Sequence, residues 1–170
     1  MVKQIGVYSP EEIFADIISR LDSFMDDLAD SILRVALNNI YSGDFSPAVG
    51  IGALDRGGLA RSGRVKRELL KKTIIFDAPY AAYVEYGTRP HFPPLDPIAG
   101  WVRRNIKVSL KTDPSRKRKA TMIESRAIAK RIVNHIGKYG TIPRPFLRRA
   151  IGHVTSPNML IILTSKYFGV

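Results

Sequence analysis

The sequence of 170 residues contains no cysteine, so disulfide bonds and thiolate metal sites are excluded. It also lacks any apolar run near the roughly 18 residues that a membrane-spanning helix needs. The longest candidate, residues 159–163, is MLIIL. The N-terminal residues show no charged start followed by an apolar core, so we expect no secretory signal. Together these absences predict a protein that folds in a cytoplasm and has no membrane partner.

Acidic residues are scarce beyond residue 30. Residues 1–30 contain seven acidic residues against Lys3 and Arg20, a net charge of −5. Since the whole chain carries +12, residues 31–170 carry +17. This separation favours either nucleic acid at the basic part or attraction between the acidic segment of one subunit and the basic body of the next. We favour the second, because a repeating heterologous contact needs complementary surfaces. The acidic residues are Glu11, Glu12, Asp16, Asp22, Asp26, Asp27 and Asp30.

Signatures of catalysis are missing from the sequence as well. The three histidines, His91, His135 and His153, have no partner at metal-ligand spacing. No pair of carboxylates suits two-metal or glycosidase chemistry, and no serine lies in a GxSxG motif. The glycine-rich segment over residues 42–58 lacks the context of a phosphate-binding loop. We therefore expect no enzyme, no metal and no cofactor.

Apolar periodicity predicts an α+β fold, with a small antiparallel β-sheet packed with a long N-terminal helix and two shorter amphipathic helices. Ser9, Pro10 and Glu12 form a helix-start signal with a capping box, and apolar residues then recur at helical spacing. Asn38, Asn39 and Gly43 predict the end of that helix. We expect one domain over residues 1–170: the helix over 1–43, a body over 44–152 and a C-terminal extension over 153–170.

Within the body, residues 64–68 and 73–77 predict two strands around a turn. Asp96 and Pro97 predict the capped start of a short helix whose apolar face includes Trp101. A mobile basic loop over residues 107–119 and a second amphipathic helix over residues 121–136, stopped by Gly137, should follow. Residues 143–152 predict a turn and a short helix, and the apolar run beginning at Met159 predicts a strand.

Two segments stand out from this background. Residues 79–94, PYAAYVEYGTRPHFPP, combine three tyrosines, one carboxylate and four prolines, and residues 143–150 read PRPFLRRA. Aromatic rings supply large contact area at low entropic cost, and prolines stiffen the chain that follows. We expect Glu85 to accept hydrogen bonds from the following turn or to pair with an arginine. The pattern indicates architecture or an interface.

The motifs YAxYVExGT at residues 80–88, RPH at 89–91 and PFLRxA at 145–150 resemble a family of tailed-bacteriophage neck proteins, known as tail-component, tail-completion or head-to-tail joining proteins. The resemblance spans residues 59–152. It implies a structural virion protein at the head–tail junction, assembled in the host bacterial cytoplasm. The expected oligomer is a hexameric ring. It should join the head-side connector or adaptor to tail-terminator or tail-tube proteins and let DNA pass.

The resemblance also implies which residues shape the interfaces. Phe146 should be a buried anchor, and Arg148 and Arg149 should meet acidic groups on a neighbouring acidic helix. For the aromatic residues, ordinary core packing is the alternative. The expected interface residues are Tyr80, Tyr83, Glu85, Tyr86, Gly87, Thr88, Arg89, His91, Pro145, Phe146, Arg148 and Arg149.

The run Arg116, Lys117, Arg118 and Lys119 leaves alternatives open. It is either a solvated loop or part of a surface that makes weak, sequence-independent contact with phosphates of the genome. Two other functions compete with the joining ring: a tail-terminator ring in the same assembly, or a basic nucleic-acid-binding protein outside the virion.

Overall fold

The computed structural model describes residues 9–42, 57–109 and 115–169 of the chain. Its α+β class is as predicted: a long N-terminal helix, α1 (Pro10–Ser42), is accompanied in the described residues by six further helices and two short antiparallel strand pairs. The predicted glycine-rich connection over residues 42–58 lies largely outside the described part. None of the helices described there is long and apolar enough to cross a membrane.

The start of α1 is confirmed in detail. The Ser9 backbone N–H donates to Glu12 Oε2 (2.8 Å), and the Glu12 N–H donates to Ser9 Oγ (3.2 Å), which is the predicted capping box. The helix continues to Ser42, and the residues that face its neighbours, such as Ile32, Ala36 and Ile40, are buried. Asn39 lies inside the helix instead of ending it.

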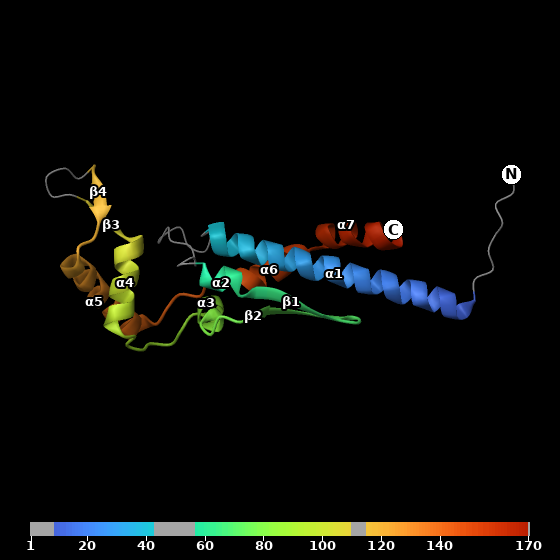
Figure 1. Ribbon diagram of the computed structural model, residues 1–170, viewed down its shortest axis with the longest axis horizontal. Helices are drawn as coiled ribbons and strands as arrows, with labels where there is room; N and C mark the ends of the chain where they lie inside the picture. Colours follow the sequence, from blue (N-terminus) through green and yellow to red (C-terminus); the bar gives the residue numbers. More distant parts are fainter. Residues whose placement is uncertain (1–8, 43–56, 110–114, 170) are drawn as a thin grey trace.

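The predicted hairpin is present, with a tighter turn. Strands β1 (Gly63–Glu68) and β2 (Lys71–Phe76) pair antiparallel, and only two residues connect them. Asp77 lies just beyond β2, where its carboxylate binds Arg64 (2.7 Å). The hairpin and the short helix α2 (Gly58–Arg61) lie along one side of α1 (Figure 1).

The C-terminal extension is a helix, so the predicted strand is wrong. After α6 (Phe146–Val154), which packs on α1, helix α7 covers Pro157–Phe168, with proline at its first position. Leu163 packs against the core, and the Tyr167 ring meets Phe24 edge-on at 6.1 Å. The β-branched pair Ile161 and Ile162 suggested a strand, but strand propensity is weak and packing against α1 decided the outcome.

Helices α4 (Leu95–Asn105) and α5 (Met122–Tyr139) form a second layer with its own small core of Ala99, Val102 and Ala129. The Thr121–Glu124 capping box starts α5, and Trp101 lies at the edge of this core, partly buried. The predicted cap at Asp96 is wrong: α4 begins at Leu95, and Asp96 instead binds Arg126 (2.8 Å).

The predicted stop at Gly137 is also wrong, because α5 runs on to Tyr139. Gly137 makes room for the Phe92 ring, since a Cβ there would lie 2.3 Å from Phe92 Cε1. The helix ends at Tyr139, and Gly140 caps it with a φ of 75°, which favours glycine. Gly137 is therefore explained by the packing of the Phe92 ring, and Gly140 by the end of the helix.

The ends of the predicted mobile loop are ordered as an antiparallel pair. Strands β3 (Lys107–Ser109) and β4 (Lys117–Lys119) pair with Lys107 opposite Lys119 and Ser109 opposite Lys117. The loop prediction is therefore wrong for these six residues, and residues 110–114 lie outside the described part. A strand pair was missed because three basic residues carry no apolar alternation.

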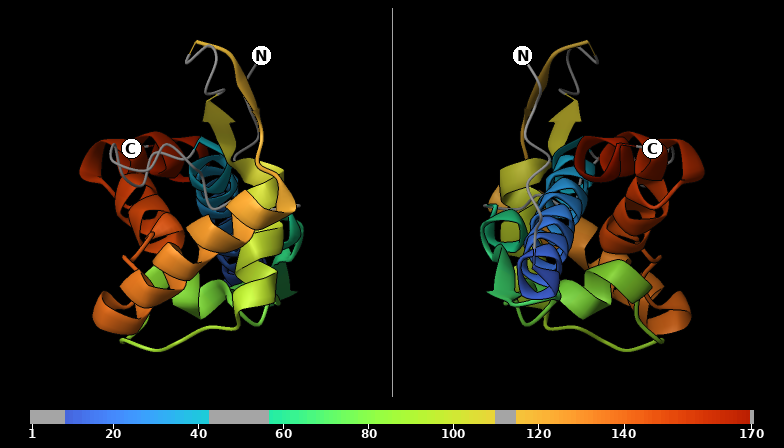
Figure 2. Two further views of the ribbon diagram at one scale, coloured as in Figure 1. Left: turned by 90° about the vertical axis from the view of Figure 1, so that its left-hand side faces the viewer. Right: turned by 90° about the vertical axis from the view of Figure 1, so that its right-hand side faces the viewer.

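The molecule is elongated. The N-terminal part of α1 forms one end and α4, α5 and the β3–β4 pair form the other, and the end-on views show each in turn (Figures 1 and 2). The chain leaves the body beside Thr88 and returns beside Thr141, where the two threonines form an isolated antiparallel bridge. Gly87 and Gly140 flank this crossing at positive φ, and a Cβ at Gly140 would lie 1.9 Å from the Thr88 carbonyl oxygen.

Candidate interface site

Glu85 joins the two unusual sequence segments. It lies in the short helix α3 (Ala81–Tyr86) with 5% of its surface exposed, and its carboxylate accepts hydrogen bonds from the backbone N–H groups of Leu147 and Arg148, both at 3.0 Å. These N–H groups are at the start of α6, where no preceding side chain caps the helix. A carboxylate at that position satisfies unpaired donors and interacts favourably with the helix dipole. Glu85 therefore caps a helix that begins about sixty residues later.

Arg148 completes this contact. Its Nε donates to Glu85 Oε1 (3.1 Å), and its guanidinium lies over the Tyr86 ring, 4.8 Å from the ring centre. The prediction that Glu85 pairs with an arginine is confirmed, whereas its backbone donors belong to α6 and not to the following turn. The prediction that Arg148 meets an acid is confirmed, but that acid is in the same chain.

Phe146 is buried, as the resemblance implied, and it packs in the core of its own chain, which was the alternative for the aromatic residues. It is 2% exposed, and its ring packs edge-on against Phe76 with the centres 4.9 Å apart. Its carbonyl oxygen accepts a hydrogen bond from Asn39 Nδ2 (2.9 Å), which ties the start of α6 to α1. Pro145 precedes it at the cap position of α6.

The tyrosines of the first segment face outward. Tyr83 and Tyr86 are 62% and 64% exposed. Tyr80 is also exposed, and a Cβ added at Gly58 would lie 2.8 Å from its hydroxyl oxygen. Simple core packing, the alternative for these rings, is therefore wrong for all three within the chain. Their exposure leaves a surface of aromatic rings held on a buried support.

Beside Tyr83 the surface is hollowed by the residues that follow. Gly87 and Thr88 form the turn at the chain crossing, and the Thr88 N–H donates to the Thr141 carbonyl oxygen (3.2 Å). The His91 N–H donates to the Ile136 carbonyl oxygen (3.3 Å), which holds the proline-rich segment against α5. The hollow is lined by Tyr83, Gly87, Thr88, Arg89, Pro90 and His91.

The acidic face of α1 is bound largely within its own chain. The buried ammonium of Lys72 contacts Asp22 (2.9 Å) and Asp26 (3.2 Å), and the hydrogen bond from Lys72 lowers the pKa of Asp22. Arg67 binds Asp26 and Asp30. Attraction to a neighbouring subunit is thus not needed to explain these three acids. Their spacing of four residues, which places them on one helix face, was the signal that could have revealed a shared partner.

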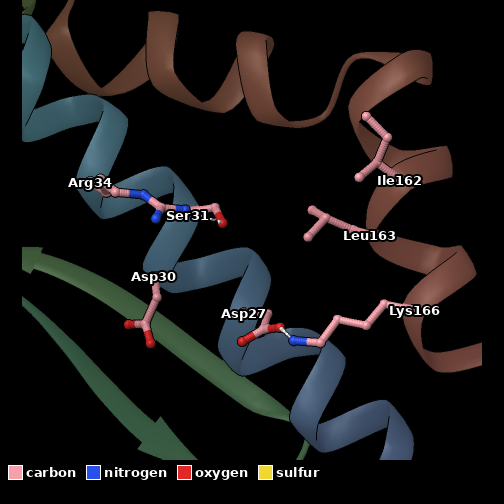
Figure 3. Close-up of a pocket in the computed structure, with 7 residues that line it drawn as sticks. All are labelled: Asp27, Asp30, Ser31, Arg34, Ile162, Leu163 and Lys166. Atoms are coloured by element: carbon pink, nitrogen blue, oxygen red, sulfur yellow. Dashed lines mark hydrogen bonds and ion pairs between the residues drawn. The ribbon is translucent and has the colours of Figure 1, made fainter.

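A second part of the same helix faces α7. Lys166 and Tyr167 both bind Asp27 Oδ2, at 2.5 and 2.6 Å, and these hydrogen bonds lower the pKa of Asp27. Figure 3 shows the groove between the two helices, with the Asp27–Lys166 contact crossing it. The groove is lined by Asp27, Asp30, Ser31, Arg34, Ile162, Leu163 and Lys166.

The basic run is divided by its strand. The Arg118 guanidinium makes two hydrogen bonds of 2.8 Å to the Glu124 carboxylate, and this lowers the pKa of Glu124 to about 2. Lys117 and Lys119 alternate with Arg118, so they point to the other face, where Lys107 lies opposite Lys119. Arg116 precedes the strand and is exposed. One face of the ribbon is therefore satisfied internally, and the other carries three lysines.

Comparison with protein-family models, with curated proteins and with solved structures finds no match to this chain.

Proposed function

We propose that this chain is a structural virion protein of a tailed bacteriophage, which forms a ring at the head–tail junction, joins the head connector to the tail and lets DNA pass. The observation that carries the proposal is the Glu85 contact with α6. It brings the two segments that resemble neck proteins, 62 residues apart at Glu85 and Leu147, into one supported unit. Segments that share a resemblance and also share a contact are expected to serve one role.

The chemistry of this unit suits docking. Glu85 and Phe146 form its buried support, while Tyr83, Tyr86 and Arg89 are presented outside. Exposed aromatic and arginine side chains on a rigid base are the residues that contribute most at protein interfaces. In the proposed hexameric ring this surface meets a neighbouring subunit or one of the adjacent rings, the head-side connector or adaptor on one side and tail-terminator or tail-tube proteins on the other. The ring is assembled in the host cytoplasm and retained in the virion.

Deletion of the coding sequence from the phage tests this function. We expect filled heads and free tails of normal length that do not join, and joining should be restored when the full chain is supplied separately. Mass spectrometry of purified particles should detect the chain, and its density should lie between head and tail. Particles that lack the chain, or that assemble normally without it, would contradict the proposal.

The tail-terminator ring predicts a different outcome of the same deletion. A terminator limits tail growth, so its loss should yield tails of abnormal length. Tail length in the lysate, measured by electron microscopy, therefore separates the two roles in one experiment.

A basic nucleic-acid-binding protein remains the alternative outside the virion, and the lysine face of the β3–β4 ribbon favours it. Lys107 and Lys119 lie directly opposite each other, an unfavourable arrangement for like charges that a bound phosphate would relieve. In the proposed ring the same face would make weak contact with the passing genome, since tight binding would hinder passage.

Substitution of Lys107, Lys117 and Lys119 by glutamine is expected to weaken binding to duplex DNA and to reduce its salt dependence. Each phosphate contact contributes about 0.9 to the slope of log K against log salt, so up to about 2.7 should be lost. Fluorescence anisotropy over a series of salt concentrations measures this slope. Arg118→Gln is the control and should change it less, because Arg118 is bound to Glu124. A DNA affinity that does not depend on salt concentration, or a slope that the triple substitution leaves unchanged, would rule out a phosphate contact at these lysines.

A further inference from the structure

The apolar stripe of α1 continues beyond the part of the helix that the body covers. At the C-terminal half, Ile32 and Ala36 are buried on this stripe. The hairpin tip reaches only as far as Asp22, where the Leu70 N–H donates to Asp22 Oδ1, and α7 ends opposite Phe24. Beyond these points α1 extends free of the described body (Figure 1). The stripe is exposed there, from 37% at Leu21 to 66% at Phe14, in the residues Ile13, Phe14, Ile17, Ile18 and Leu21.

The charges beside this exposed stripe limit which kind of partner can bind it. Glu11, Glu12 and Asp16 flank it, and Arg20, the single base in this part of the helix, binds Asp16 (2.7 Å). Two such segments packed against each other would bring acids together, and an anionic lipid surface would be repelled. A partner of this stripe should combine apolar side chains with positive charge.

The opposite end of the same chain has that combination. The buried apolar residues of the α4–α5 pair are only Ala99, Val102 and Ala129, which is a thin core for two helices. Two packed helices cover only the apolar surface between them. A layer of two helices therefore leaves apolar surface that a further element can cover. Larger apolar residues around this core are only partly buried: Leu95, Ile98, Trp101, Ile106, Ile128 and Ile132.

Positive charge predominates in the described residues that form this end of the molecule. In the described residues of the region, the acids Asp96 and Glu124 are each bound to an arginine. The basic residues of the same described stretch are far more numerous: Arg103, Arg104, Lys107, Arg116, Lys117, Arg118, Lys119, Arg126, Lys130, Arg131 and Lys138.

We infer that the exposed N-terminal part of α1, residues 10–21, packs onto the α4–α5 pair of a second copy of this chain. The incoming helix adds a third helix to the thin layer, and its acids meet the basic side chains around it. The two surfaces lie at opposite ends of an elongated molecule (Figures 1 and 2), so the contact is head-to-tail. Head-to-tail contacts form rings when their rotation closes. The inference rests on the proposed function to the extent that it identifies the subunit contact of the proposed ring.

Substitution of Phe14 and Ile17 by serine in the full chain tests the stripe. We expect association between copies, measured by sedimentation velocity over a range of concentrations, to weaken by at least about a hundredfold, because two apolar side chains lose their burial. Both positions lie outside the buried core, so circular dichroism should show unchanged folding. The matched control is Ile161→Ser with Ile162→Ser, which removes two exposed apolar side chains from α7 and should leave association unchanged. Equal loss in both variants would overturn the inference.

A photo-crosslinking residue, benzoylphenylalanine, in place of Phe14 identifies the surface that the stripe contacts. In the full chain and in purified virions, we expect cross-links to residues 95–139 of another copy. Cross-links to α1 of another copy, to the same chain or to another protein would overturn the inference, as would a chain that stays monomeric and forms no cross-link between copies. A chain located at the head–tail junction with cross-links elsewhere would leave the proposed function standing, whereas absence from virions would remove that function itself.

Discussion

Replacing Phe146 with alanine is expected to lower the free energy of unfolding by about 3–5 kcal/mol, the range for removing a fully buried phenylalanine. The ring is 2% exposed and packs against Phe76 and the core of α1 and α6, so its loss leaves a cavity that close neighbours cannot fill. Urea unfolding followed by circular dichroism measures the change. A loss of this size is a large fraction of the roughly 5–15 kcal/mol that stabilises a typical domain.

Tyr83→Ala is the control for that experiment. Tyr83 lies in the same candidate site, but it is 62% exposed, and we expect its removal to cost less than about 1 kcal/mol. If Phe146→Ala cost no more than Tyr83→Ala, the buried position of Phe146 would be wrong, and with it the support of the site.

Replacing Glu85 with alanine is expected to cost about 2–3 kcal/mol. The backbone N–H groups of Leu147 and Arg148 would lose their acceptor at the start of α6, and each unpaired donor in a protected position is costly. Guanidinium chloride unfolding measures the loss of stability, and hydrogen exchange at the Leu147 and Arg148 amides reports the helix start directly.

Arg148→Met separates the two parts of the Glu85 contact. It removes the ion pair but leaves both backbone donors satisfied, and the Arg148 side chain is 55% exposed, so solvent screens the lost attraction. We expect a cost of about 0.5–1 kcal/mol. An Arg148→Met cost equal to that of Glu85→Ala would mean that the ion pair, and not the cap, holds α6 in place.

Several elements could be predicted because their signals lie within a few residues of one another. The start of α1 follows from Ser9, Pro10 and Glu12, and the β1–β2 hairpin follows from apolar alternation around a turn. The pairing of Glu85 with an arginine was expected from a lone carboxylate in a basic chain, and the burial of Phe146 was what the resemblance to neck proteins implied. For the helix start and the hairpin, the local chemistry and the final packing require the same structure.

The errors share a different physical origin. The run over residues 159–163 has the composition of a strand, yet it became a helix because α1 offered a surface for Leu163 and Tyr167. Glycine often ends a helix, yet Gly137 lies inside α5 and leaves room for the Phe92 ring. Both outcomes depend on a group that is distant in the sequence, and no local pattern contains that information.

The sequence by itself determined the α+β class, the long amphipathic helix and the separation of acidic from basic residues, since these follow from composition and from periodicity along one stretch of chain. Only the tertiary structure decided that Glu85 caps α6, that Lys72 lies between Asp22 and Asp26, and that the α1 stripe is covered over half its length. Hydrogen bonding and burial depend on which surfaces meet in space, and that is decided by the packing of the whole chain at once.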